Sequence, residues 1–273
     1  MAATLRVVSW NIRAAIGPGP FPDRWWRRID ADRLRAIGDV LASLDADIIA
    51  LQEVALISRD GDLVDNAGDL ARQLGSDVRY GAVRSFTVTD DGDTVVGVGC
   101  FGNALLTTQP MRASRTVALP VAARDAFVEP PGADHPAAGV TYADAPDTIR
   151  EPRCLLLADV GRLRVGTAHF SHVGGGERLL QADATAAAFG SAPAGLLLGD
   201  LNAAIGAPEL APFEGWTDGF AEPPDDEART STDDGMAIDQ VLARGASVSS
   251  ARVVRESGDL SDHYPVVAEV SVP

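Results

Sequence analysis

The sequence predicts a strand-rich α/β domain. Residues 4–11 alternate and are β-branched enough for an opening strand, and residues 29–44 carry apolar side chains near helical spacing. Residues 47–51 form a short apolar run of the kind that lies inside a sheet. The same order of strand, helix and strand returns between residues 163 and 199, so the second half echoes the first, although no repeat is strong enough to indicate duplication.

The remaining elements follow from the same kinds of pattern. Gly161-Arg162 separates two apolar runs and predicts a hairpin, and Gly174-Gly175-Gly176 precedes a helix that runs to about Phe189. Residues 120–150 are rich in Pro, Ala and Asp without periodicity, which predicts a long surface loop. In chain order we expect a helix at 66–74, strands at 78–83, 103–107, 114–119, 154–160, 163–170 and 194–199, and closing strands at 238–243, 249–254 and 266–272.

Length and composition limit the function. We expect one domain over residues 1–273, because no long polar linker divides the chain. The formal charge, 23 minus 39 or −16, argues against a protein that holds a polyanion mainly through Lys and Arg, so a phosphate substrate would need a cation to reach it. The first residues do not resemble a signal peptide, and no apolar run reaches about 18 residues, so we expect a soluble, cytoplasmic protein. We also expect a monomer. Cys100 and Cys154 lack metal-site or disulfide spacing, and both are predicted to be buried thiols.

Polar residues interrupt the apolar runs at the ends of the predicted strands. They are Asn11 in SWNIR, Glu53 in LQEV, His169 in TAHFSH, Asp200 and Asn202 in GDLNA, Asp239 in IDQV, and Asp262 with His263 in SDHYP. In GDLNA, Gly199 permits a close backbone approach, and strand alternation would place Asp200 and Asn202 on one side. Pro265 keeps Asp262 and His263 on the turn before the last strand, where they are free to face a cleft.

This ordered set resembles the endonuclease/exonuclease/phosphatase superfamily, from about Arg6 to Val270. Each motif alone is weak, but six in the right order, each at the end of an apolar run, make a strong signal. The resemblance implies a four-layer α-β-β-α sandwich, in which two mixed β-sheets pack face to face with helices outside. It also implies Mg²⁺ or Mn²⁺ and attack by water on a phosphate ester.

Three of these residues are implied as metal ligands. The resemblance makes Glu53 the principal ligand, places Asn11 beside it, and makes Asp262 a further carboxylate on the metal side. Mg²⁺ is a hard ion that prefers oxygen ligands and keeps several waters, so one or two carboxylates and a substrate phosphate suffice. The structural alternatives are a charge at an element end for Glu53, a solvated turn acid for Asp262, and a strand-end Asn bonding a loop for Asn11.

The other motif residues are implied as catalytic. Asp200 resembles the residue that orients or deprotonates the water, and Asn202 one that positions phosphate and nucleophile. His263 would contact the scissile phosphate with Asp239 orienting it, because a histidine held by a carboxylate has a fixed tautomer and a favoured cation. His169 resembles the histidine of the deoxyribonuclease, sphingomyelinase and inositol-phosphatase branches, and we assign it to phosphate binding or leaving-group protonation. The structural alternatives are an Asx turn in GDLNA, a surface acid at Asp239 and a satisfied buried histidine at His169.

Three more residues are candidates for binding the substrate. Asn103, in FGNALL, matches a stretch common in bacterial members, and Arg153, in EPRCLL, could reach a phosphate. Arg28 belongs to DRWWRR, in a segment that holds five Arg against three Asp between residues 23 and 35. That segment is either a substrate-binding rim or an amphipathic helix start with its Trp packed inward, and we prefer the second interpretation.

The sequence therefore predicts a Mg²⁺- or Mn²⁺-dependent hydrolase of a phosphate ester. The substrate is expected to be a small phosphorylated metabolite, a phospholipid head group or another phosphodiester. A nuclease is the alternative, and nucleic acid is possible but not favoured, because Gln240 follows Asp239 where many relatives have an aromatic residue. A silent phosphate-binding module is the second alternative, which the complete set of candidate ligands disfavours.

Overall fold

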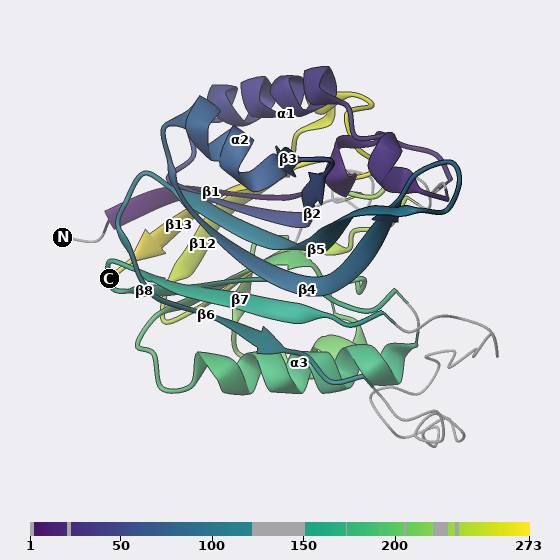
Figure 1. Ribbon diagram of the computed structural model, residues 1–273. Coiled ribbons are helices and arrows are strands. Elements are labelled where there is room, and N and C mark those ends of the chain that lie inside the picture. Colours follow the sequence, from purple (N-terminus) through teal and green to yellow (C-terminus); the bar gives the residue numbers. More distant parts are fainter. Residues whose placement is uncertain are drawn as a thin grey trace.

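Two β-sheets lie face to face, with helices on their outer faces (Figure 1). The computed structural model describes residues 3–20, 23–121, 151–172, 174–204, 206–220, 229–232 and 235–273. The strands are β1 (Ala3–Asn11), β2 (Ile48–Arg59), β3 (Asp62–Asp65), β4 (Asp77–Thr89), β5 (Val95–Thr107), β6 (Met111–Ala118), β7 (Cys154–Val160), β8 (Leu163–His169), β9 (Gly195–Asp200), β10 (Thr217–Asp218), β11 (Asp239–Arg244), β12 (Ser247–Val253) and β13 (Val266–Val272). The helices are α1 (Ala31–Ser43), α2 (Asn66–Leu74) and α3 (Gly175–Phe189), with short 3-10 turns η1 (Arg13–Ala15), η2 (Trp25–Arg27), η4 (Pro208–Phe213) and η5 (Arg255–Ser257).

Each sheet is mixed because it contains one parallel pair of neighbouring strands. The first sheet has the order β12-β13-β1-β2-β5-β4, with β3 paired to β2, and β1 is parallel to β2. The second has the order β10-β11-β9-β8-β7-β6, and β8 is parallel to β9. Helix α1 joins the first parallel pair and α3 joins the second, which is the strand, helix, strand order that the sequence predicts in both halves. The carboxyl ends of a parallel pair meet at one edge of their sheet.

Apolar side chains fill the space between the two sheets. Alternate residues of each strand point inward, so Val7 and Leu105 of the first sheet meet Leu156 and Leu198 of the second, and all four are fully or almost fully buried. This inner layer fixes how the sheets face each other, because interiors are packed at crystal-like density.

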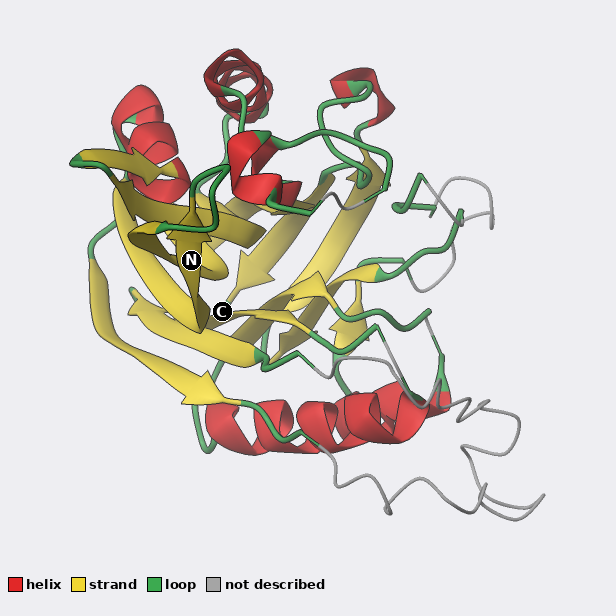
Figure 2. Ribbon diagram, turned by 45° about the vertical axis from the view of Figure 1, so that its right-hand side comes forward, coloured by secondary structure: helices red, strands yellow, loops and turns green. Residues whose placement is uncertain are grey.

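The outer faces of both sheets are covered by helices (Figure 2). Ile37 of α1 and Leu70 of α2 pack onto the first sheet beside Trp10, and Phe189 of α3 packs onto the second beside Leu197. The predicted four-layer α-β-β-α sandwich is therefore confirmed.

The observed helix ends have local causes that the sequence carries. Helix α1 begins after Asp30, whose carboxylate accepts hydrogen bonds from the backbone nitrogens of Asp32 and Arg33 at 2.8 and 3.2 Å. Helix α2 ends at Gly75, which takes the left-handed conformation with φ of 63°.

Most predicted strands and helices are present, and the differences are local. Strand β2 runs on to Arg59, past the predicted end at residue 51, and β4 and β5 form a hairpin much longer than the predicted strands. The pair β2 and β3 was not predicted. Residues 122–150 of the predicted long loop lie outside the described residues, and Cys100 is half-buried where a buried thiol was expected.

None of the helices that the structure describes is long and apolar enough to cross a membrane.

Candidate active site

The predicted site residues come together where the carboxyl ends of the parallel strands of both sheets meet. Asn11 ends β1, His169 ends β8 and Asp200 ends β9, with His169 and Asp200 paired in register. Asp239 opens the antiparallel strand β11 directly opposite Asp200. Gly199 allows β9 to lie close to β8, because a Cβ there would lie 2.0 Å from the carbonyl oxygen of Ala168.

A β-bulge in β2 turns Glu53 toward this cluster. The pairing of β2 with β5 shifts between Leu51 and Val54, so that Gln52 and Glu53 together oppose Asn103. Glu53 accordingly has a left-handed φ of 53°, an uncommon conformation for a residue other than glycine. The bulge lets both side chains be used, because Gln52 Nε2 donates to Thr167 Oγ1 of the second sheet at 2.9 Å while Glu53 faces the site.

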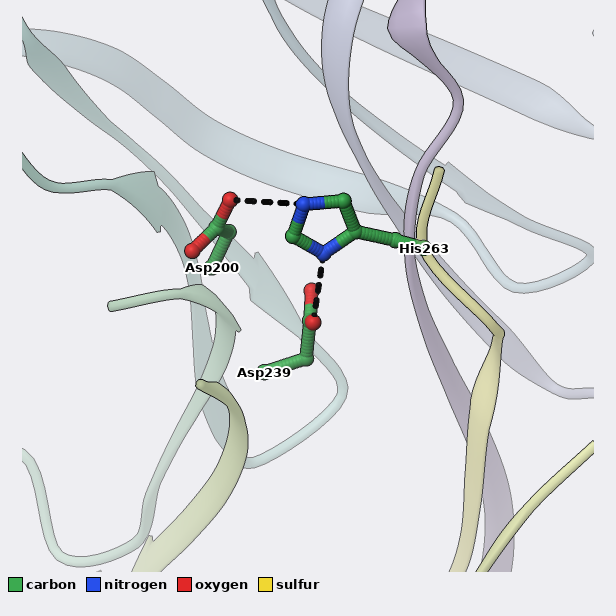
Figure 3. A group of neighbouring side chains, drawn as sticks. All are labelled: Asp200, Asp239 and His263. Carbon is green, nitrogen blue, oxygen red and sulfur yellow. Dashed lines mark hydrogen bonds and ion pairs between the residues drawn. The ribbon is translucent and has the colours of Figure 1, made fainter. Parts of the chain in front are cut away.

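His263 lies between two aspartates (Figure 3). Its Nδ1 donates to Asp239 Oδ2 at 2.7 Å, and its Nε2 is 3.7 Å from Asp200 Oδ2. Trp10 Nε1 donates to the His263 carbonyl at 2.8 Å and holds the backbone in place. Burial opposes a charge on His263, but the carboxylates of Asp239 and Asp200 outweigh it and raise its pKa well above the usual range. The imidazole is therefore held as a cation whose Nε2 faces Asp200.

Asn11 joins the carboxylates of the two sheets. Its Nδ2 donates to Glu53 Oε1 at 3.0 Å and to Asp200 Oδ2 at 3.1 Å, while its Oδ1 accepts from the backbone nitrogen of Arg13 at 3.0 Å. To ligate a metal through oxygen, this amide would have to turn. In the arrangement described here, Asn11 sets the separation between Glu53 and Asp200.

Asp200 is buried and Glu53 is partly exposed, and their surroundings shift the pKa of both carboxyl groups. Burial raises the pKa of Glu53, and repulsion from Asp262 raises it further. Burial also raises the pKa of Asp200, although the positive charge on His263 opposes that shift. Both groups are therefore harder to ionise than ordinary carboxyl groups, and a cation close to them would offset that cost.

His169 is held from both sides. Arg153 Nη1 lies 3.1 Å from His169 Nδ1, and because arginine can only donate, Nδ1 must accept and the proton lies on Nε2. His169 Nε2 lies 3.3 Å from Asp200 Oδ2. Burial, with Arg153 and His263 nearby, lowers the pKa of His169 well below its usual value, so this histidine is neutral. A neutral His169 positions Asp200 and leaves Arg153 as the cation on this side.

Asp262 and Asn202 lie beside the cluster, each with a protein partner. Asp262 Oδ2 is 3.2 Å from Nε of the buried Arg13. Asn202 Nδ2 donates to the Phe170 carbonyl at 3.0 Å, and its backbone nitrogen donates to Asp200 Oδ1 at 3.1 Å. The expected strand alternation is wrong here, because β9 ends at Asp200 and Asn202 takes a left-handed φ of 48°. An Asx turn, with Asp200 as its acceptor, joins the two residues.

The donor set suits a hard divalent cation. Glu53 and Asp262 are partly exposed at their side chains, 17% each, and they offer carboxylate oxygens, whereas Asn11 would offer its oxygen only after its amide turned. Asp200, Asp239 and His263 are a second possibility, because one ligand atom of each lies within 4.8 Å of the others. The 2.7 Å contact of His263 with Asp239 is already a hydrogen bond, and this favours the carboxylates of the first set.

A cavity of about 440 Å³ opens in front of these residues. One end is polar, with Glu53, His169, Asp200 and His263 among the lining residues. The predicted substrate-binding residues are placed differently from one another: Asn103 and Arg153 line the cavity, whereas Arg28 is exposed and is not among its lining residues. Asn103 Nδ2 donates to the Cys154 carbonyl at 3.0 Å, which ties β5 to β7 at the cavity wall.

Several lining or supporting residues were not predicted. His172 Nδ1 lies 3.3 Å from Arg153 Nη2, and His172 lines the cavity. Gln52 joins the sheets beneath the site, and its only sequence signal is a polar residue in an apolar run. Trp25 and Trp26 line the apolar end of the cavity, where the favoured interpretation was inward packing alone.

Comparison with known proteins agrees with this architecture. The sequence profile of the Endonuclease/Exonuclease/phosphatase family matches residues 8–263. A search of curated protein sequences found no significant match.

Solved structures share the fold at low sequence identity. An endonuclease/exonuclease/phosphatase from Beutenbergia cavernae is 20% identical with a TM-score of 0.68, over 98% of this chain and 72% of that one. The Bacteroides thetaiotaomicron mannosyl-6-phosphatase Bt3783 is 19% identical with a TM-score of 0.60, over 97% of this chain and 99% of that one. The human Nocturnin catalytic domain with bound sulfate is 16% identical with a TM-score of 0.61, over 99% and 94%. At these identities the likeness concerns the fold.

Proposed function

Since the chain belongs to the endonuclease/exonuclease/phosphatase family, we propose that it is a divalent-metal-dependent phosphoesterase that hydrolyses a small phosphate ester. One observation carries this proposal. A buried Asp239 holds a cationic His263 whose free nitrogen faces Asp200 across 3.7 Å, at the polar end of a cavity that Arg153 and His169 also line.

Each side chain has a physical role in this reaction. His263, as a cation, donates a hydrogen bond to a phosphate oxygen, and Asp239 fixes its tautomer and orientation. Asp200 lies where a water can be oriented or deprotonated, since its raised pKa brings it closer to the range of a general base. Arg153 adds positive charge for the phosphate.

Mg²⁺ or Mn²⁺ held by Glu53, with Asp262 and Asn11 beside it, would neutralise phosphate charge and stabilise the leaving oxygen. This addresses the difficulty that the composition raises. An acidic protein of net charge −16 cannot attract an anion over a distance, so positive charge must be concentrated locally.

The experiment is hydrolysis of a panel of phosphate monoesters and diesters, including bis(4-nitrophenyl) phosphate, with Mg²⁺ and with Mn²⁺. Turnover that disappears in chelator and in His263→Ala supports the proposal, and Glu256→Gln on the surface serves as a control. Plasmid nicking that requires Mg²⁺, without turnover of small esters, would favour a nuclease. Absence of turnover of every ester in both proteins would favour a phosphate-binding module. We also propose that the protein is cytoplasmic and monomeric.

A further inference from the structure

Two arginines of the basic segment before α1, Arg24 and Arg27, bind the protein itself. Arg24 Nη1 donates to the Asp90 carbonyl at 2.8 Å and Arg27 Nη2 to the Thr89 carbonyl at 3.1 Å. Their guanidinium groups also pair with the carboxylates of Asp93 and Asp91 in the acidic turn that joins β4 and β5. This basic segment therefore anchors η2 to the tip of the β4–β5 hairpin, and these two arginines are not directed at a substrate phosphate.

This anchorage places two tryptophans against two phenylalanines of the hairpin. The Trp25 ring lies 5.2 Å from that of Phe86 and 5.1 Å from that of Phe101, both tilted or edge-on. Trp26 stacks on Phe86 with centroids 5.6 Å apart and planes at 27°. We call these four residues the aromatic wall, and each of them is half-buried and lines the cavity.

The aromatic wall and the catalytic residues are two ends of one cavity. The whole cavity has a volume of about 440 Å³, which is typical of small-molecule sites. A phosphate group would fill only its polar end. Beside the aromatic wall, Arg84, which is paired in register with Phe101, lines the cavity and donates to Glu151 Oε1 at 3.0 Å. Few polar groups there converge on a ligand, as a polyhydroxyl group such as a sugar would require.

We propose that the aromatic wall binds a planar aromatic ring of the ester, so that the substrate class is small phosphate esters that carry an aromatic group. This rests on the proposed function, because it takes the phosphate to lie at the polar end. Aromatic rings pair with one another in stacked or edge-to-face arrangements, and an alkyl group of equal area lacks this preference. Stacking of a ring on an aromatic side chain changes affinity by roughly 5- to 150-fold.

The test uses phosphonates, whose P–C bond this hydrolysis does not break. Binding of naphthylmethyl-, cyclohexylmethyl- and methylphosphonate would be measured by calorimetry in the presence of Mn²⁺. Wild type is expected to bind the naphthyl compound at least roughly tenfold more tightly than either other compound. Trp26→Leu and, independently, Phe101→Leu are expected to reduce this ratio at least about fivefold. Trp216→Phe is the matched control, because Trp216 packs on Phe189 and Phe213, away from the cavity.

The outcomes separate this inference from the proposed function. Equal binding of the naphthyl and cyclohexyl compounds, a ratio unchanged in both cavity variants, or no binding of any phosphonate at millimolar concentration overturns the inference. Ester turnover without aromatic preference overturns the inference alone. Selective naphthyl binding in a protein that turns over no ester overturns the proposed function and leaves the aromatic site standing.

Discussion

Replacing Asp239 with Asn tests the role of His263 most directly. Asp239 is fully buried, and its Oδ2 accepts a hydrogen bond from His263 Nδ1 at 2.7 Å. Asn has nearly the same shape but no charge. The change therefore removes the anion that raises the pKa of His263 and leaves burial, which lowers it, less opposed.

The size of the effect follows from this contact. Two unit charges about 4 Å apart interact by roughly 4 kcal/mol at an effective dielectric constant of about 20. A hydrogen bond to a charged group contributes about 1.5–3 kcal/mol, which gives the lower limit. A loss of about 1.5–4 kcal/mol, at about 1.36 kcal/mol for each factor of ten, predicts a decrease in kcat of roughly 10- to 10³-fold.

Steady-state hydrolysis of the best ester and calorimetric titration with Mn²⁺ would both be measured on Asp239→Asn. Because Asp239 is proposed to orient His263 and not to hold the ion, the Kd for Mn²⁺ should change by less than about threefold. Asp218→Asn is the control, a half-buried aspartate of β10 remote from the cavity, and it should leave kcat unchanged. A Kd for Mn²⁺ that rises more than about tenfold, or a kcat that falls less than about tenfold, would refute the reasoning.

Three further changes test the surroundings of the site. Burial raises the pKa of Glu53, so the folded state binds its proton more tightly than the unfolded state, and stability without metal falls as pH rises above about 4.3 through the folded pKa. Glu53→Gln should therefore raise the Tm of the metal-free protein at about pH 8, as measured by thermal denaturation. In wild type, Mn²⁺ at about 100 times its Kd is expected to raise the Tm by roughly 5–10 °C, and Glu53→Gln should abolish this rise. Arg27→Ala, which frees η2 from the hairpin, should weaken naphthylmethylphosphonate binding roughly threefold or more while costing less than about 1 kcal/mol of stability. Arg35→Ala, which breaks an exposed ion pair elsewhere, should change neither quantity. Equal effects of the two variants would contradict the anchoring role of Arg27. Gly199→Ala should lower the free energy of unfolding in urea by about 1–3 kcal/mol, because the added Cβ would lie 2.0 Å from a carbonyl oxygen. Gly92→Ala, whose Cβ would meet no neighbour closer than 3.4 Å, should lower it little. Similar losses in the two variants would contradict the close approach of the strands.

The sequence predicted the fold where one face of an element is buried and its periodicity is therefore regular. Helix α2 matches the predicted residues 66–74, and β13 matches 266–272. Prediction failed where both faces are partly exposed, as in the outer half of the β4–β5 hairpin, whose burial alternates weakly between residues 84 and 99. It also failed across the bulge in β2, because an extra residue breaks the alternation that marks a strand.

Most motif residues were predictable because they are polar interruptions at the end of an apolar run, although Glu53 lies within β2 and not at its end as expected. Asn11, His169, Asp200 and Asp239 lie at strand ends, and register alone brings three of them together. Trp25 and Trp26 were ambiguous, since a tryptophan before a helix looks the same whether it packs inward or lines a cavity. What decides their place is a contact with an acidic turn more than 60 residues further along the chain, which no local pattern contains.

The site depends on the inter-sheet core as much as on its own residues. Asn11 and Glu53 belong to the first sheet, whereas His169, Asp200 and Asp239 belong to the second, so a change in the distance between the sheets moves one group relative to the other. Two hydrogen bonds cross this gap, from Gln52 to Thr167 and from Asn11 to Asp200. A catalytic arrangement is sensitive to displacements of about 1 Å, because reacting groups must be held close to their productive geometry. The close packing between the sheets therefore maintains the separation between Glu53 and Asp200.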